Sequence, residues 1–239
     1  MEVHVVVAPV FATNCCVVVA GPRHDDGTRD CVVVDPGAGV ADGVARVVDD
    51  RRLRVRAVLA THGHVDHTWD AAALCERYGV PMRLHAADAY RLTDPFGTLG
   101  LGAGGPGVSG ALRQALAGLG LRAEDHRAPS RVEPFDGDGR TLTAGDVVLR
   151  AVHAPGHTEG STLYVLDDAD PPGVVLAGDV LFAGSVGRTD LPGGDPETMR
   201  ATLRDVVARL DPALAVVPGH GPATTVGQEL ATNPFLAAR

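Results

Sequence analysis

Four candidate metal ligands fall within six residues in the segment Thr61-His62-Gly63-His64-Val65-Asp66-His67. The apolar run 57–60 directly before it is typical of a buried strand. Because alternate side chains of a strand share a face, His62 and His64 could reach a common ion from the strand's carboxyl end. Imidazole and carboxylate are the usual ligands of divalent zinc, so this spacing favours a metal site over solvated loop residues. The chain is therefore expected to fold so that a strand ends at a metal site.

The residues after this cluster predict a helix over 68–78, closed by Gly79 and Pro81. Such a helix places Asp66 and His67 at its amino end, where they point away from His62 and His64. One strand-to-helix turn could therefore serve two adjacent ions.

Three further candidate ligands follow apolar, strand-like runs and have glycine neighbours. The runs 147–152, 174–177 and 214–217 precede His157, Asp179 and His220. Open α/β sheets bind ligands at the carboxyl ends of their strands, and glycine or proline lets the backbone turn close to an ion. Each residue alone would more often be a turn residue. Their occurrence together with the first cluster favours a shared metal site.

The whole ligand set resembles that of the metallo-β-lactamase superfamily, and more narrowly its small glyoxalase II-like (hydroxyacylglutathione hydrolase-like) branch. The resemblance extends over nearly the full chain, through the segments 33–37, 181–190, 224–227 and 233–236. Alternation of strand-like runs with helical ones, such as 40–52 and 196–210, indicates an α/β protein. The resemblance implies a four-layer αββα sandwich, with residues 1–239 forming one domain.

The same resemblance implies two divalent metal ions, zinc foremost, with iron or manganese permitted by the ligand types. One ion is expected on His62, His64 and His157. The second is expected on Asp66, His67 and His220, with Asp179 bridging the two. Asp66 and Asp179 would thereby be catalytic, and Asp35 would orient a ligand histidine, as metal sites commonly require.

Two cations held close together would acidify a bridging water, giving a hydroxide placed to attack a carbonyl carbon. A thiolate leaves without a strong general acid, since thiols have a pKa of about 8.5. The expected substrate is therefore a small-molecule thioester, such as S-lactoylglutathione or a related thiol ester. Lactone hydrolases keep the same ligands and stay an alternative. Persulfide dioxygenases with one iron are another, although their terminal histidine follows Pro-Ala rather than the Pro218-Gly219 of this chain.

Arg188 is the candidate substrate-binding residue, because it falls where larger glyoxalase II enzymes have a lysine. It could bind a carboxylate of the substrate. The alternative is a structural ion pair with Asp190. The chain ends soon after Phe235, so the carboxyl-terminal helical domain of those enzymes is not expected, which leaves a carrier other than glutathione, such as mycothiol, open.

Composition narrows the partners further. The net charge is −9 and all 21 basic residues are arginine, without a basic run, which argues against a nucleic-acid partner. The amino terminus has no basic region, and its apolar run is too short for an export signal or a membrane span, so a cytoplasmic location without membrane contact is expected. Cys15, Cys16, Cys31 and Cys75 lack zinc-like or redox spacing and are expected to be buried reduced thiols.

The segment 92–131 is the least regular part of the chain, with clustered glycines before a helical stretch at 111–119. It could be a lid inserted beside the site, or a mobile surface insertion. Its glycines lack the spacing of a phosphate-binding loop.

Overall fold

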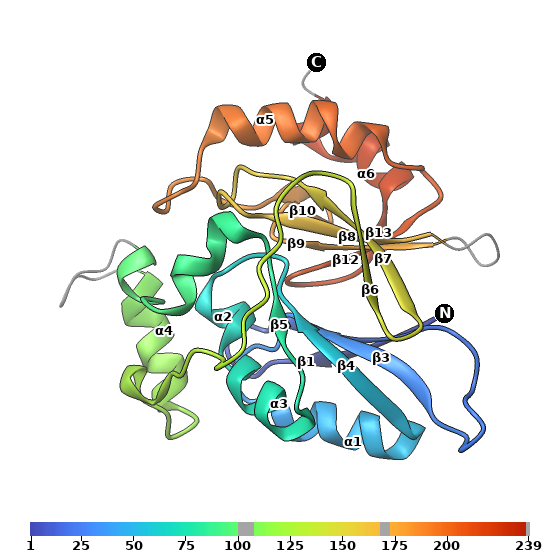
Figure 1. The fold of residues 1–239 in the computed structure, drawn as a ribbon. Coiled ribbons are helices and arrows are strands. Elements are labelled where there is room, and N and C mark those ends of the chain that lie inside the picture. The colour runs from blue at the N-terminus through green and yellow to red at the C-terminus, as the bar shows by residue number, and fades with distance from the viewer. Residues whose placement is uncertain (100–107, 168–172, 238–239) are drawn as a thin grey trace.

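Two β-sheets lie face to face, and helices cover the outer face of each (Figure 1). This is a computed structural model, and it describes residues 1–99, 108–167 and 173–237. In this part of the chain, the first sheet has the order β1 (Glu2–Val7), β2 (Asn14–Val19), β3 (Arg29–Val34), β4 (Leu53–Leu59) and β5 (Met82–Arg83). The second has the order β13 (Thr224–Thr225), β12 (Ala215–Pro218), β9 (Val174–Gly178), β8 (Thr162–Leu166), β7 (Val147–His153) and β6 (Arg140–Ala144). A small hairpin follows β9, formed by β10 (Leu181–Phe182) and β11 (Ser185–Val186).

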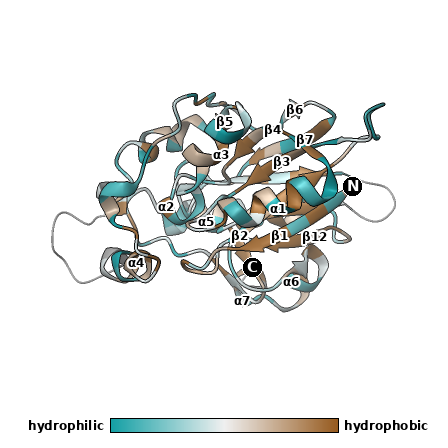
Figure 2. Ribbon diagram, turned by 90° about the horizontal axis from the view of Figure 1, so that it is seen from below, coloured by the Kyte–Doolittle hydropathy of each residue, from teal (hydrophilic) through white to brown (hydrophobic). Residues whose placement is uncertain are grey.

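The inner strands are buried on both faces, as their continuous apolar sequences require. In β2, Cys15 and Val17 pack in the cluster between the first sheet and its helices. The alternate residues Cys16 and Val18 pack in the cluster between the two sheets, together with Leu149 of β7. Figure 2 shows that the strands are predominantly hydrophobic. Because alternate side chains point to opposite faces of the sheet, one strand thus contributes to two hydrophobic clusters.

The outer layers are amphipathic helices. The helices α1 (Ala41–Arg51) and α3 (Ala71–Tyr78) pack on the first sheet, with Val44 and Leu74 fully buried. On the second sheet lie α5 (Pro196–Asp205) and α6 (Val226–Thr232), followed by α7 (Pro234–Ala237). The predicted α/β fold with four layers, helix–sheet–sheet–helix, is confirmed.

The strand connectivity brings the chain repeatedly to one end of the sandwich. β3 runs parallel to β4 in the first sheet, and β9 runs parallel to β12 in the second. Parallel neighbours end at the same edge, so the residues that follow these four strands meet there. All the predicted ligands but His157 follow β4, β9 or β12, and His157 lies in the connection between β7 and β8.

Two predicted helices are shorter than expected. The helix predicted at 68–78 is divided into α2 (Val65–Thr68) and α3, because Asp70 forms hydrogen bonds with residues outside the helix. Its Oδ2 accepts a hydrogen bond from the N–H of Ala41 at the start of α1 (2.8 Å), and its own N–H donates to the carbonyl of Pro36 (2.9 Å). The helix predicted at 196–210 ends at Asp205, and a 3₁₀ turn, η4 (Val207–Arg209), follows.

The irregular segment 92–131 is folded against the domain in the part that the structure describes. After the 3₁₀ helix η1 (Ala86–Leu92), it contains η2 (Gly97–Leu99), α4 (Val108–Ala117) and η3 (Ala123–Asp125). Leu112 and Leu116 are buried in a cluster with Val65 and Trp69, beside the predicted ligands of α2. Residues 100–107 lie outside the described residues, and the role of the segment as a lid stays a prediction.

Two smaller expectations can be compared with the structure. The four cysteines are buried and free, as predicted for reduced thiols. None of the helices in the described ranges is long and apolar enough to cross a membrane.

Candidate metal centre

The structure brings all seven predicted ligands together at the carboxyl ends of the parallel strands. His62 and His64 follow β4, and Asp66 and His67 lie in α2. His157 comes from the loop between β7 and β8, Asp179 directly follows β9, and His220 follows β12. Both sheets therefore contribute to one site.

His62, His64 and His157 form a three-histidine group. The distance from His64 Nδ1 is 3.1 Å to His62 Nε2 and 3.0 Å to His157 Nε2. All three side chains are buried. Burial and the neighbouring His157 lower the pKa of His64 to about 3, so its imidazole is neutral and able to bind a metal.

Asp66, His67 and His220 form a mixed group beside the first. The Nε2 atoms of His67 and His220 are 3.2 Å apart, and Asp66 Oδ2 lies 3.5 Å from His220 Nε2. Burial lowers the pKa of His220, but the facing carboxylates of Asp179 and Asp66 outweigh this effect and raise the pKa to about 9. Negative charge thus collects where a cation would lie.

Asp179 lies between the two groups. Its Oδ2 is 3.6 Å from His157 Nε2 in the three-histidine group and 3.5 Å from His220 Nε2 in the mixed group. Its buried Oδ1 has no hydrogen-bond partner. One carboxylate thus faces both groups, the arrangement that the predicted bridging role requires.

Two of the ring nitrogens that point away from the centre lie against backbone carbonyls. His157 Nδ1 lies 2.8 Å from the carbonyl oxygen of Arg188, and His220 Nδ1 lies 2.9 Å from that of Phe11. A carbonyl can only accept, so each Nδ1 carries a proton, and in the neutral imidazole Nε2 is left to present its lone pair to the centre. His67 Nδ1 lies 3.1 Å from Asp35 Oδ2.

Asp35 thus lies where the resemblance places it, behind a candidate ligand. It follows β3, next to the end of β4, and its backbone has a left-handed φ of 54°. Its carboxylate also accepts hydrogen bonds from the N–H and the hydroxyl of Thr61, both at 2.7 Å. Aspartate tolerates this conformation better than most residues, and the hydrogen bonds hold its carboxylate in place.

Two close approaches at the centre require glycine. A Cβ atom at Gly219 would lie 2.2 Å from Asp179 Oδ1, and one at Gly187 would lie 1.7 Å from the Asp179 carbonyl oxygen. Glycine beside His220 therefore lets the two strand ends of the second sheet meet, as the sequence pattern indicates.

The sequence analysis missed the carbonyl groups of Phe11 and Arg188, and also Thr61 as a partner of Asp35. Backbone carbonyls have no residue signature, so no sequence signal could identify the first two. Phe11 has a φ of 56°, a strained conformation in the turn between β1 and β2 that brings its carbonyl to His220.

The side chain of Arg188 is half exposed and is paired with Asp190 through two hydrogen bonds of 2.6 Å. This is the structural ion pair considered from the sequence. Beside it lies a groove of about 940 Å³, with Met199, Leu203 and Phe235 in its apolar lining. The guanidinium is therefore available to a ligand only in competition with Asp190.

The two groups fit divalent metal ions. His64 Nδ1 lies 3.1 Å from His62 Nε2 and 3.0 Å from His157 Nε2, so this one nitrogen cannot satisfy both neighbours, and the buried Asp179 Oδ1 is unsatisfied. Nitrogen and carboxylate oxygen form a donor set for zinc, iron or manganese. A cation in each group would relieve these unpaired acceptors.

Comparisons with known proteins agree with the fold. Residues 8–220 match the family model of the metallo-β-lactamase superfamily. An uncharacterized protein of Mycobacterium tuberculosis is 38% identical over 231 residues, which cover 96% of this chain and 95% of the relative. The hydroxyacylglutathione hydrolase GloC of Haemophilus influenzae is 29% identical over the full length of both chains, 239 residues.

Two solved structures are also similar. The BLEG-1 B3 metallo-β-lactamase has a TM-score of 0.77 and 29% identity, and the match covers 99% of this chain and 100% of that one. TTHA1623 in a di-iron-bound form has a TM-score of 0.72 and 31% identity, and the match covers 98% of this chain and 100% of that one. The chain belongs to the metallo-β-lactamase superfamily, whose members bind divalent metals.

Proposed function

We propose that this protein is a binuclear metallohydrolase that cleaves a thioester of a small thiol, such as S-lactoylglutathione. The observation that carries the proposal is the position of Asp179 Oδ2, 3.6 Å and 3.5 Å from nitrogens of the two groups. Likeness to GloC over the whole chain supports the thioester as the substrate.

In this proposal His62, His64 and His157 would hold one ion and Asp66, His67 and His220 the second, and Asp179, which lies between the two groups, would be available to both. The ions, most simply zinc, would supply Lewis acidity and acidify a water at neutral pH. The carbonyls of Arg188 and Phe11 keep two ligand histidines in the tautomer that offers Nε2. Asp35 Oδ2 faces Nδ1 of His67 at 3.1 Å, so its carboxylate would orient that imidazole by charge.

The remaining residues explain why a thioester suits the site. In the part of the chain that the structure describes, the two groups of candidate ligands contain no lysine or tyrosine, so a leaving group would depart without help from such an acid. A thiolate can do so. Arg188 is the proposed contact for a carboxylate of the carrier thiol, in place of Asp190. The net charge of −9 supports a small-molecule substrate rather than a nucleic acid.

Hydrolysis of a β-lactam is a second candidate, because BLEG-1 is 29% identical over nearly the whole chain. The opening of a lactam amide expels an amine, which needs a proton more than a thiolate does. Thioester cleavage is therefore the preferred proposal on chemical grounds.

The test is hydrolysis of S-lactoylglutathione by protein loaded separately with zinc, iron or manganese. A chelated sample and the Asp179→Ala variant are the controls, and a mycothiol thioester and a cephalosporin are parallel substrates. Chelator-sensitive thioester cleavage that is lost in Asp179→Ala is the expected result. Cleavage of the cephalosporin alone, or thioester cleavage that survives in the variant, would refute the proposal.

A further inference from the structure

A buried carboxylate outside the metal centre joins two of the loops that carry ligands. Asp88 lies in η1 and is fully buried. Its Oδ2 accepts hydrogen bonds from the N–H of Gly63 (2.7 Å) and the hydroxyl of Thr158 (2.7 Å). Its Oδ1 accepts from the N–H of Gly160 (2.8 Å) and from Nε of Arg91 (3.2 Å).

Two of these donors lie next to candidate metal ligands in the sequence. Gly63 lies between His62 and His64 on the turn after β4, and Thr158 directly follows His157. These two segments come from different sheets. Asp88 therefore connects, with one side chain, the backbone that carries all three members of the three-histidine group.

The backbone approaches Asp88 closely enough to require glycine on both sides. A Cβ atom at Gly63 would lie 2.8 Å from the Asp88 carbonyl oxygen, and one at Gly160 would lie 2.7 Å from Asp88 Cβ. Such distances are too short for any other residue without movement of the backbone. The close approach of η1 thus explains why a glycine, Gly63, lies between His62 and His64.

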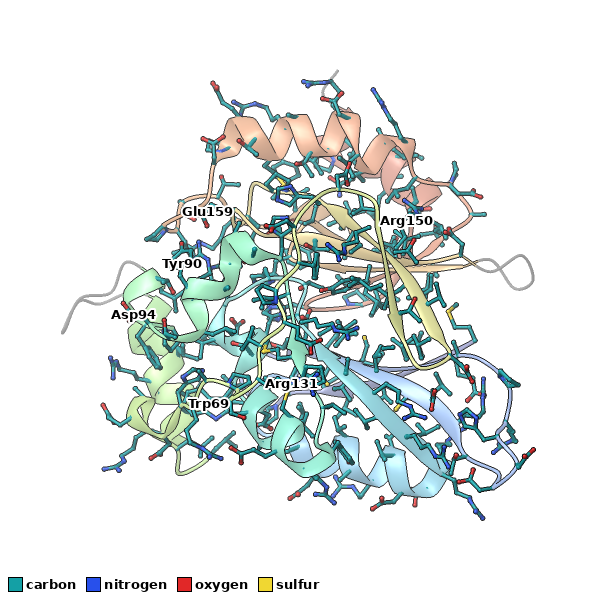
Figure 3. The ribbon with its side chains drawn as sticks, viewed as in Figure 1. Trp69, Tyr90, Asp94, Arg131, Arg150 and Glu159 are labelled. Carbon is teal, nitrogen blue, oxygen red and sulfur yellow. The ribbon has the colours of Figure 1, made fainter. Side chains whose placement is uncertain are left out.

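A buried guanidinium compensates the charge of Asp88. The side chain of Arg91 is fully buried and bonds Asp88, Glu159 and the carbonyls of Thr98 (3.4 Å) and Pro192 (3.0 Å). Glu159 continues the network to the surface, where the hydroxyl of Tyr90 lies 3.3 Å from its Oε1 (Figure 3). A buried ion pair with all its hydrogen bonds satisfied tolerates little change in geometry.

We infer that Asp88 is a positioning residue, which sets the spacing of His62 and His64 relative to His157 and so determines the metal affinity of the three-histidine group. It does not reach the centre, and the mixed group has no hydrogen bond to it. Loss of its carboxylate should therefore weaken one metal site and spare the other. The inference rests on the metal centre of the proposed function and is independent of the substrate.

The substitution Asp88→Asn tests this separation. An amide has nearly the shape of a carboxylate, but in either orientation its NH₂ must face at least one backbone N–H, that of Gly63 or that of Gly160. We expect the zinc affinity of one site to fall by about 10- to 100-fold, the range for partners of metal ligands, and that of the other site to stay unchanged. Metal-free protein is titrated with Zn²⁺ against a chromophoric chelator, which resolves the two affinities without any assay of turnover.

Asp30→Asn is the matched control. Asp30 is as deeply buried as Asp88, pairs with Arg56 (2.7 Å) and accepts from the N–H of Asp146 (3.0 Å), at the opposite end of β3 from Asp35. It has no hydrogen bond to the candidate ligands, to Gly63 or to Thr158, and with His24 and Asp146 it forms a separate group that could hold a cation away from the centre. Its variant should lose stability as Asp88→Asn does, yet bind both zinc ions normally. Equal loss at both sites in Asp88→Asn, or no loss at either, would overturn the inference.

If Asp88→Asn does not fold, the hydroxyl of Thr158 provides a milder test. Thr158→Val removes one donor to Asp88, whereas Thr158→Ser keeps it. We expect weaker zinc binding at one site in the valine variant and normal binding in the serine variant, and equal affinities in the two would contradict the inference. A wild-type protein that binds two zinc ions but cleaves no thioester would refute the proposed substrate and leave this inference intact.

Discussion

Arg188 is the proposed contact for a carboxylate of the substrate. Its guanidinium is held by Asp190, so a substrate carboxylate must displace that partner. We expect Arg188→Ala to raise KM for the thioester by about 10-fold, the value of one charge-assisted hydrogen bond at an exposed position, with little change in kcat. A remote contact that is equally strong in ground and transition states gives this pattern.

Asp190→Ala is the complementary variant, because it frees the guanidinium. Steady-state kinetics of both variants should show KM moving in opposite directions. If KM is unchanged in Arg188→Ala, the ion pair with Asp190 is structural and the substrate contact lies elsewhere.

The candidate ligands were predictable from the sequence because each stands in a short local pattern. His62, His64 and His67 share one segment, and His220 lies between two glycines after an apolar run. The groups that orient them were mostly not predictable. The carbonyl of Phe11 reaches His220 across more than two hundred residues of sequence, and Asp88 is an ordinary aspartate in the sequence until the fold places it against Gly63.

At the scale of elements, the segment with α4 contributes buried side chains to the domain. A mobile surface insertion would bury little, yet Leu112 and Leu116 are almost fully buried against Trp69 and Val65. We expect Leu116→Ala to lower the free energy of unfolding by about 2–5 kcal/mol, the cost of a buried leucine replaced by alanine. Urea denaturation measures it directly.

Leu119→Ala, at a side chain that is 42% exposed, serves as the control and should cost far less. Equal and small effects of the two substitutions would show that α4 adds no core and would return the segment to the mobile-insertion interpretation. If only Leu116→Ala lowers the free energy of unfolding, α4 is part of the packed core. Any lid movement would then have to involve other parts of 92–131.

The elements themselves were predicted well where a strand or helix had a continuous pattern. The divided helix at α2 and α3 was not, because its break depends on a distant partner. Asp70 leaves the helical path to bond Ala41 at the start of α1, and helical propensity carries no information about that contact. The layer order also came from resemblance and not from periodicity, since a buried run of valines fits several sandwich folds.

At the scale of the whole molecule, the metal centre joins the two halves of the sandwich. Some of the side chains at the centre follow β3 and β4 of the first sheet, and others follow β9 and β12 of the second. Ions bound between them would therefore connect both sheets. Without metal, carboxylates and imidazoles of the two halves must satisfy one another. Metal binding and folding should therefore be coupled, and the coupling should depend on pH.

His220 determines the direction of that dependence. The folded, metal-free protein holds its pKa at about 9, above the value of about 6.5 expected in the unfolded chain. Its protonation therefore stabilises the fold fully below pH 6.5, and this contribution is lost as the pH rises through 9. His64, with a pKa of about 3, stays neutral over the same window.

A metal ligand needs a neutral imidazole, so the proton that stabilises the metal-free protein opposes metal binding. We expect zinc at about 100 times its dissociation constant to raise Tm by roughly 5–10 °C per site, and the gap between loaded and chelated protein to widen from pH 6.5 to pH 9. Thermal unfolding followed by circular dichroism at the two pH values measures this gap. In His220→Ala the metal-free protein should lose the decline above pH 6.5. A gap that narrows as the pH rises, with the wild-type centre fully loaded at both values, would mean that His220 carries no proton in the metal-free fold and that the two halves are joined in some other way.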